Sequence, residues 1–356
     1  MRVAVGVGFG GPSSGKRWDW PAMVDFVREA ESLGVDFAWS AESWGNDAVT
    51  PLAYLAGKTS RIVLGTGIMQ ITARTPVMTA MTALTMASLT GGRFALGLGT
   101  SGPQVVEGLH AARFSDPLGR LRENIEIIRK SFAGEKIAHR GKHYELPLPD
   151  GEGKALRLGH EPRNDIPIYL ASLSPRSLEL TGELADGWLG TSFIPARAGA
   201  MLDYIGRGAA KAGRDMSELD IQAGGSLAIC DDEHSLRDLV ERRKPALAFT
   251  LGAMGSSQHN FYNQAFRRAG YEREAIEVQK LWLDRNREAA VAKVPDRMVL
   301  DANLLGTEEM LRERIAEYRD AGVTTLRLAP EGNTLDERVE TLAKAMALIR
   351  DVCGPA

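Results

Sequence analysis

Apolar residues follow two different periods along most of this chain. Short apolar runs, typical of buried strands, are followed by longer segments in which apolar residues recur at helical spacing. In the first of these segments, 21–33, Met23, Phe26 and Val27 share one face, and Gly34 marks the end. The other predicted helices are 49–58, 76–89, 118–132, 174–185, 196–212, 232–251, 307–320 and 334–352.

The apolar runs between these helices predict eight strands. A strand followed by a helix, repeated eight times, predicts a TIM (β/α)8 barrel with insertions, formed by residues 1–356 as a single domain. We expect a loop insertion at 133–165 with a short hairpin around 137–146, and an irregular, helical insertion at 252–300. Pro245 is expected to interrupt the helix before the second insertion. The predicted strands are 2–9, 35–41, 61–68, 94–98, 166–171, 187–193, 221–230 and 323–329.

Composition and charge exclude several classes of partner. The formal net charge is −3 with no basic run, which argues against a nucleic-acid partner. No apolar run reaches the roughly 18 residues that a membrane span needs. Cys230 and Cys353 are the only cysteines and have no C-x-x-C spacing, which is typical of reduced thiols in a cytoplasmic protein. His139 and His143 flank Gly141 outside any predicted helix, so no metal site is expected there.

The segment 92–107 is the most informative part of the chain. It begins as a buried strand and then becomes a loop of small and polar residues, the pattern with which α/β enzymes build a site at the carboxyl end of a sheet. Gly99 and Gly102 would let a ligand approach bare backbone N–H groups. Gln104 and Glu107 are the first long polar side chains after the strand.

Two glycine patterns in the chain match G-x-G-x-x-G, one beginning at Gly6 and one at Gly97. A dinucleotide site requires the third glycine to open a helix, so that the pyrophosphate meets the helix N-terminus. After Gly11 a polar loop follows, and after Gly102 we expect the helix to be delayed or irregular. A Rossmann site is therefore the weaker interpretation of both patterns.

The predicted strand ends bring together small, apolar and hydroxyl-bearing residues with few charges. Glu42 is the only carboxylate at a strand end, and Glu107 lies further out in its loop. Such a set suits a planar cofactor that brings its own chemistry. Ser172 and Ser174 offer hydroxyls for an anion, although Ser174 is also expected to cap the helix that begins at Pro175. Phe9, Trp44, Met69 and Phe193 are expected to line a dry pocket.

These motifs together resemble the luciferase-like flavin and deazaflavin oxidoreductases, most closely their coenzyme F420-dependent branch. The resemblance covers nearly the whole chain and is strongest over 36–130. The matching stretches are Ala41-Glu42-Ser43-Trp44 with Asp47, Thr59 to Ile68, Arg74-Thr75-Pro76, Gly92 to Gly99, Ser101 to Gly108, and Gly182-Glu183-Leu184-Ala185-Asp186-Gly187.

The resemblance implies a barrel that is usually dimeric, with the ring of the cofactor in the barrel mouth and its phosphate over the strand-end loops. It also implies a cis peptide bond between Gly67 and Ile68, behind the ring. Some sugar-phosphate relatives have an Asp-His pair where this chain has Glu42 and Ser43, so that substrate class is doubtful here. The cofactor-binding residues that the resemblance and the loop chemistry predict are Glu42, Ser43, Thr66, Gly67, Ile68, Met69, Gly99, Thr100, Ser101, Gly102, Gln104, Ala171, Ser172 and Ser174.

Glu42 and Glu107 are the candidate catalytic acid/base residues, and the alternative role for Glu42 is a hydrogen bond that holds a loop. The function that the resemblance implies is hydride transfer between F420 and a small organic substrate that the sequence does not identify. The alternative is an FMN-dependent monooxygenase that receives reduced flavin from a partner reductase. A barrel that binds the cofactor without catalysis, and an enzyme without redox chemistry, stay open as further alternatives.

Overall fold

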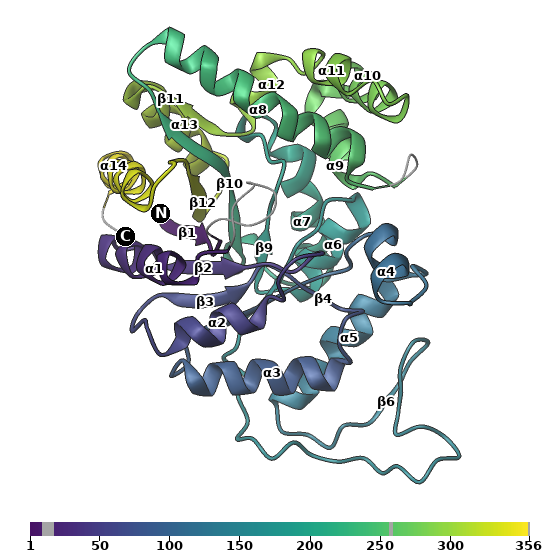
Figure 1. The fold of residues 1–356 in the computed structure, drawn as a ribbon. Helices are drawn as coiled ribbons and strands as arrows, with labels where there is room; N and C mark the ends of the chain where they lie inside the picture. Colours follow the sequence, from purple (N-terminus) through teal and green to yellow (C-terminus); the bar gives the residue numbers. More distant parts are fainter. Residues whose placement is uncertain (9–17, 256–258, 355–356) are drawn as a thin grey trace.

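Eight parallel strands form a closed barrel in the computed structural model, which describes residues 1–8, 18–255 and 259–354. Each strand pairs in parallel with the next, and β9 pairs with β10 to close the ring. The predicted TIM barrel is confirmed (Figure 1). Its strands are β1 Arg2–Gly6, β2 Phe37–Ser40, β3 Val63–Thr66, β5 Phe94–Gly99, β8 Ile168–Leu170, β9 Gly187–Leu189, β10 Asp220–Ile229 and β12 Thr325–Pro330.

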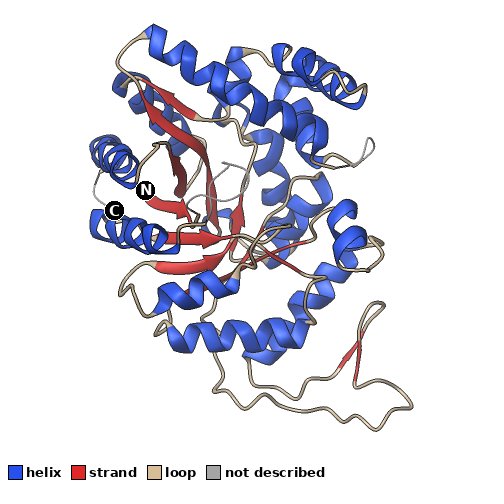
Figure 2. Ribbon diagram, viewed as in Figure 1, coloured by secondary structure: helices blue, strands red, loops and turns tan. Residues whose placement is uncertain are grey.

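Helices surround the barrel, as the alternation of apolar periods predicts (Figure 2). Several begin at a residue whose side chain accepts a backbone N–H of the first turn, among them Asp19, Ser174 and Thr334. The expected cap at Ser174 is therefore confirmed, with Pro175 as the first helical residue. The surrounding helices are α1 Trp20–Leu33, α2 Val49–Ala56, α3 Pro76–Leu89, α5 Pro117–Phe132, α6 Pro175–Leu184, α7 Gly199–Lys211, α13 Glu308–Asp320 and α14 Leu335–Cys353.

Two short elements occupy segments that we expected to be loop. The two-residue strand β4, Met69–Gln70, pairs in parallel with β5 and extends the barrel wall beyond β3. The helix α4, Pro103–Leu109, begins directly after Gly102, so the expectation of a delayed helix was wrong. Proline is favoured in the first turn, where its missing N–H costs nothing, and this explains the early start.

The helix α8, Glu233–Ala253, continues through Pro245, so the predicted interruption was also wrong. A proline inside a helix removes one backbone hydrogen bond and crowds the preceding turn. Here Leu239, Val240 and Ala248 on the same helix are buried in a hydrophobic cluster. The packing of this face outweighs the local preference of one residue.

Both predicted insertions have structure of their own. In the first, β6 His139–Arg140 and β7 Glu145–Leu146 form the predicted antiparallel hairpin, which extends away from the barrel (Figure 1). The second contains α9 Phe261–Phe266, the π-helical turn η4 Arg267–Tyr271, α10 Glu272–Leu283, α11 Arg287–Ala292 and α12 Asp296–Asp301. After it, the strand β11, Leu304–Gly306, pairs with β10 and was not predicted.

No helix in the described part of the chain is both long enough and apolar enough to cross a membrane.

Candidate active site

Large side chains fill the barrel interior below its mouth. Phe37, Trp39, Tyr169 and Leu189 form a cluster separate from the main core that lies between strands and helices. Trp39 stacks on Phe37 with ring centroids 5.6 Å apart and meets Tyr169 edge-on at 5.1 Å. Because these aromatic rings close the barrel from below, a ligand can enter only from the carboxyl ends of the strands.

A polar network completes this closed end. Asp220 forms an ion pair with Arg2 at 2.8 Å and accepts hydrogen bonds from Tyr169 at 2.9 Å and from Thr325 at 2.8 Å. The indole N–H of Trp39 donates to Gln222 at 3.0 Å. Burial, together with the charge of Asp220, raises the pKa of Tyr169, so this phenol stays protonated. The network fixes the floor of the barrel and has no ionic group left to act on a ligand.

The inward positions of the upper half carry mostly small residues. Alternation along the strands places Gly6, Gly67, Gly99 and Gly224 on the same inward face as Ala4, Gly65, Gly97 and Gln222. A Cβ added at Gly6 or Gly8 would have no atom of the described residues within 4 Å, whereas one at Gly99 would meet Ile68, so the open space lies above Gly6 and Gly8. TIM barrels usually pack this region with branched side chains. Here Gly6 and Gly8 are exposed, so the barrel is open at this end, and we call the space above Trp39 the hollow.

A bulge between β3 and β4 forms one wall of this hollow. The peptide bond between Gly67 and Ile68 is cis, as the resemblance implied. Thr66 is fully buried, and its hydroxyl bonds both N and O of Gly97 at 2.9 Å, which bridges the gap between the paired parts of β3 and β4. Ile68 faces the hollow beside Gly99, whereas Met69 is buried in the outer core.

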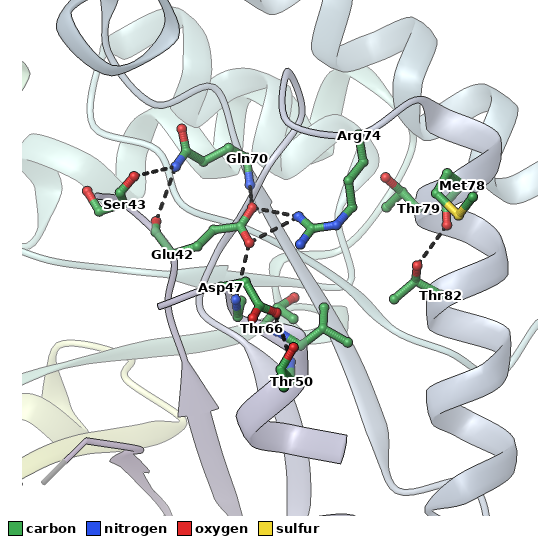
Figure 3. Close-up of polar contacts among 12 residues, drawn as sticks. Glu42, Ser43, Asp47, Thr50, Thr66, Gln70, Arg74, Met78, Thr79 and Thr82 are labelled. Atoms are coloured by element: carbon green, nitrogen blue, oxygen red, sulfur yellow. Dashed lines mark hydrogen bonds and ion pairs between the residues drawn. The ribbon is translucent and has the colours of Figure 1, made fainter. Parts of the chain in front are cut away.

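Glu42 holds the loop after β2 to this bulge (Figure 3). Its carboxylate accepts hydrogen bonds from the backbone N–H of Gln70 at 2.9 Å and of Ala48 at 3.2 Å. Arg74 forms an ion pair with it at 2.8 Å, and only 7% of the Glu42 side chain is exposed. Both carboxylate oxygens are therefore engaged, which favours the loop-holding role over proton transfer.

Gln70 lies beside Glu42 with one polar atom unused. Its amide nitrogen donates to the backbone oxygen of Ser43 at 3.2 Å, while its Oε1 is buried and has no hydrogen-bond partner among the described residues (Figure 3). A buried acceptor without a donor is costly and is commonly satisfied by a ligand. The side chain of Ser43 itself is exposed at the mouth.

The loop after β5 crosses the mouth and leads into α4. Ser101 has a left-handed backbone with φ 57°, a conformation that is unfavourable for a residue with a Cβ and is found preferentially at functional sites. Gly102 is extended and caps α4, on which Gln104 is exposed. Thr100 is half-buried, and its hydroxyl donates to the backbone of Ser101 at 3.3 Å.

Glu107 and His110 lie on and after α4. One oxygen of Glu107 accepts the backbone N–H of Phe114 at 3.0 Å, and the side chain is otherwise exposed. His110 ends the helix, and its Nε2 is buried with no partner among the described residues. No sequence pattern singles out His110, although it ends the helix that follows the glycine-rich loop.

The loop after β8 forms the opposite wall. Ala171 packs against the aromatic floor cluster, and Ser172 is buried with its hydroxyl 2.7 Å from that of Thr181. Ser174 uses its hydroxyl and its backbone N–H in the cap of α6. The side chain of Arg268, from the second insertion, donates to the backbone oxygen of Leu173 between them.

Arg327 is the one charged side chain that points into the upper half of the barrel from the described strands. It lies on β12 beside Ala4 and Gly224, and its guanidinium donates to the backbone oxygen of Gly190 at 3.1 Å. No carboxylate of the described residues pairs with it, and burial lowers its pKa to about 10. It was not predicted, because a single arginine in a strand gives no indication of a missing counter-ion.

The expected dry pocket is not formed by the residues proposed for it. Phe193 packs against Trp188 and Tyr318 in the outer core. Met69 is buried in the same core and also does not face the mouth. Trp44 is 61% exposed, and Phe9 lies outside the described residues. The side chains that form the floor are those of Trp39 and its cluster, whose inward orientation depends on a strand register that apolar runs alone do not fix.

Comparison with known proteins gives consistent matches. A sequence model of the family described as "Luciferase-like monooxygenase" matches residues 2–325. A protein of Mycobacterium tuberculosis with the provisional name coenzyme F420-dependent oxidoreductase is 40% identical over 85% of this chain and 89% of its own length. The 5,10-methylenetetrahydromethanopterin reductase of Archaeoglobus fulgidus is 29% identical over 84% of this chain and 86% of its own.

The fold matches solved structures in the same way. The coenzyme F420-dependent tetrahydromethanopterin reductase from Methanopyrus kandleri superposes with a TM-score of 0.75 and 23% identity, covering 96% of this chain and 98% of that one.

Proposed function

Because the chain belongs to the luciferase-like monooxygenase family, we propose that it is an oxidoreductase that transfers hydride between coenzyme F420 and a small organic substrate. The hollow upper half of the barrel carries this proposal. The open space beside Gly6 and Gly8, above a floor of aromatic rings, leaves room for a flat ring system. The described strands place no acid or metal-ligand cluster in it, so the reactive group would come from the cofactor.

Several groups around the hollow fit such a cofactor. Gln70 offers a buried acceptor for a ring N–H, and Arg327 offers a donor for ring oxygens. Backbone N–H groups from Gly99 to Gly102, between the end of β5 and the start of α4, would hold the side chain of the cofactor. The predicted set is proposed in two roles: Ser43, Ile68, Gly99, Thr100, Ser101, Gly102, Gln104 and Ala171 contact the cofactor, and Glu42, Thr66, Gly67, Met69, Ser172 and Ser174 shape its walls.

When bound, the deazaflavin supplies the carbon that accepts or releases hydride, so the protein needs to provide only positioning, a dry site and one proton-transfer group. Of the two candidate acid/base residues, Glu42 has both oxygens occupied. Glu107 keeps one oxygen free of partners among the described residues. We therefore assign proton transfer to Glu107 and the positioning of Gln70 to Glu42.

Replacement of Glu107 tests this assignment. Glu107→Gln should lower kcat by about 10²–10⁴-fold, because general acid/base catalysis is lost, while F420 binds as before. Turnover is followed by the absorbance of oxidised F420 with a panel of alcohols, imines and enones. Glu152→Gln, an exposed carboxylate in the first insertion, is the matched control. Full activity of Glu107→Gln would remove this residue from the mechanism.

We propose that two copies of the chain form a homodimer through α3. This 14-residue helix has no charged residue, and Met78, Met81 and Leu89 on it are 50%, 39% and 58% exposed. Such an uncharged, exposed face is typical of an interface. Sedimentation of the purified protein as a monomer would contradict it.

We also place the protein in the cytoplasm. Cys230 and Cys353 are both unpaired, which suits a reducing compartment. Recovery of the protein in the membrane or secreted fraction of its host would contradict this placement.

A further inference from the structure

One arginine from the second insertion reaches the barrel mouth. Arg268 lies in η4, and its Nη2 donates to the backbone oxygen of Leu173 in the loop after β8. Leu173 stands between Ser172 and Ser174, in the loop for which the sequence predicted an anion site. The insertion therefore places a positive charge beside a loop that belongs to the barrel.

The guanidinium of Arg268 lacks the partners that such a group normally has. Its Nε is buried and has no hydrogen-bond partner among the described residues, and none of their carboxylates forms an ion pair with it. The undescribed residues 9–17, 256–258 and 355–356 contain no Asp or Glu. Burial lowers the pKa of Arg268, with nearby Tyr204 opposing this effect. An arginine held in this way needs an anion, because a partly desolvated charge without one is costly.

A cavity of about 530 Å³ opens next to Arg268. Two further arginines, Arg197 and Arg207, line it, and Asp203 is the only carboxylate of the lining. Arg207 is paired with Glu179 at 3.3 Å, whereas the exposed Arg197 has no ion pair among the described residues. The balance of charge along this cavity is positive, so it suits a ligand with several negative charges.

We propose that Arg268 and Arg197 form a subsite for the anionic side chain of the cofactor, with Arg268 on the phosphate and Arg197 on the carboxylates beyond it. This inference rests on the proposed function and adds the group that recognises the side chain. The second insertion would then have a role in binding, since it supplies the charge that the barrel loop lacks. The alternative is that Arg268 only ties the insertion to Leu173.

Two probes separate these roles: F420, and the deazaflavin riboside FO, which has the same ring without phosphate or carboxylates. Arg268→Gln should weaken F420 binding by about tenfold to a hundredfold, as expected for loss of a charged hydrogen bond, and change FO binding less than about twofold. Arg268→Lys should recover part of the loss. Arg267→Gln is the matched control, because Arg267 is the neighbouring arginine and pairs with Glu272 at 2.9 Å.

Each outcome is decisive. If Arg268→Gln weakens F420 and FO equally, the residue is a structural tie and the inference is wrong. Unchanged F420 binding would overturn it as well. If Arg268→Gln does not fold, Arg197→Gln at the exposed end of the cavity must weaken F420 by about threefold to tenfold and leave FO unchanged, as expected for a more solvated charge. A wild-type protein that binds neither probe would instead contradict the proposed function.

Discussion

Single residues decide where this barrel is open and where it is closed. Trp39 and Tyr169 fill the floor, Gly67 and Gly99 make room for Trp39 and Ile68, and Gly6 leaves its inward position open. Replacing such a glycine has a steric cost: a Cβ on Gly99 would lie 2.8 Å from Ile68. The site is therefore defined by absent side chains as much as by present ones.

Arg327 illustrates the cost of placing a charge in this hollow. Its lowered pKa means that the folded state disfavours the charged form, so the penalty is present at every pH below about 10 and fades as the pH rises through that value. Arg327→Met should stabilise the free protein at pH 7 by about 1–2 kcal/mol, because an uncompensated charge is replaced by an apolar chain.

Urea unfolding of the wild type and of Arg327→Met measures this difference in the free energy of unfolding. The same variant should bind F420 more weakly, since it lacks the donor to the ring. A variant that is less stable than the wild type would show that the Gly190 hydrogen bond outweighs the burial of the charge.

Helix caps and helix ends could be predicted from the sequence, whereas contacts between residues far apart in the chain could not. The cap at Ser174 and the end of α1 at Gly34 follow from neighbouring residues, and both are confirmed. The partner of Glu42 is Arg74, on a different loop, so its ion pair depends on the folded arrangement. The same holds for Arg268 and Leu173, which come from an insertion and a strand end.

At the scale of elements, Glu31 links α1 to the start of β3. Its carboxylate accepts backbone N–H groups of Ser60 at 2.9 Å, Arg61 at 2.6 Å and Ile62 at 2.9 Å. Partial burial acts to raise its pKa, but these hydrogen bonds outweigh it and hold the pKa below the ordinary 4.5. The carboxylate thus fixes the turn that leads into β3 of the barrel.

The stability that Glu31 contributes depends on pH. Because its folded pKa is lowered, the contribution is fully present above about pH 4.5 and is lost as the pH falls through the folded value. Glu31→Gln should cost about 1 kcal/mol at pH 7, after allowance for solvent exposure, and much less at pH 3. Urea unfolding at both pH values, with the exposed Asp25→Asn as control, checks this. A pH-independent cost would contradict it.

Element boundaries differ from the predictions where packing overrides a local preference. Pro245 predicts a break, but the buried face of α8 keeps the helix continuous. Residues 69–75 contain no strong strand pattern, yet β4 forms because the bulge at Gly67 returns the chain to the edge of β5. Neither effect is visible in a short window of sequence.

The whole molecule combines a barrel with a helical insertion that has a separate hydrophobic core. That core joins α8, α10 and α12 to Ala228 and Leu305 of the neighbouring strands. The barrel could be predicted because each repeat is a local pattern of strand and helix. The arrangement of the insertion could not, because its helices are short and their packing partners lie on α8 and on the far ends of β10 and β11.

The central claim is that this hollow binds a deazaflavin, and equilibrium titration of the purified protein with F420 and with FMN tests it most directly. Quenching of tryptophan fluorescence gives both dissociation constants under the same conditions. The account predicts that F420 binds at least about tenfold more tightly than FMN, a difference of about 1.4 kcal/mol. Tighter binding of FMN, with oxygen uptake when reduced flavin is supplied, would contradict it and favour a monooxygenase.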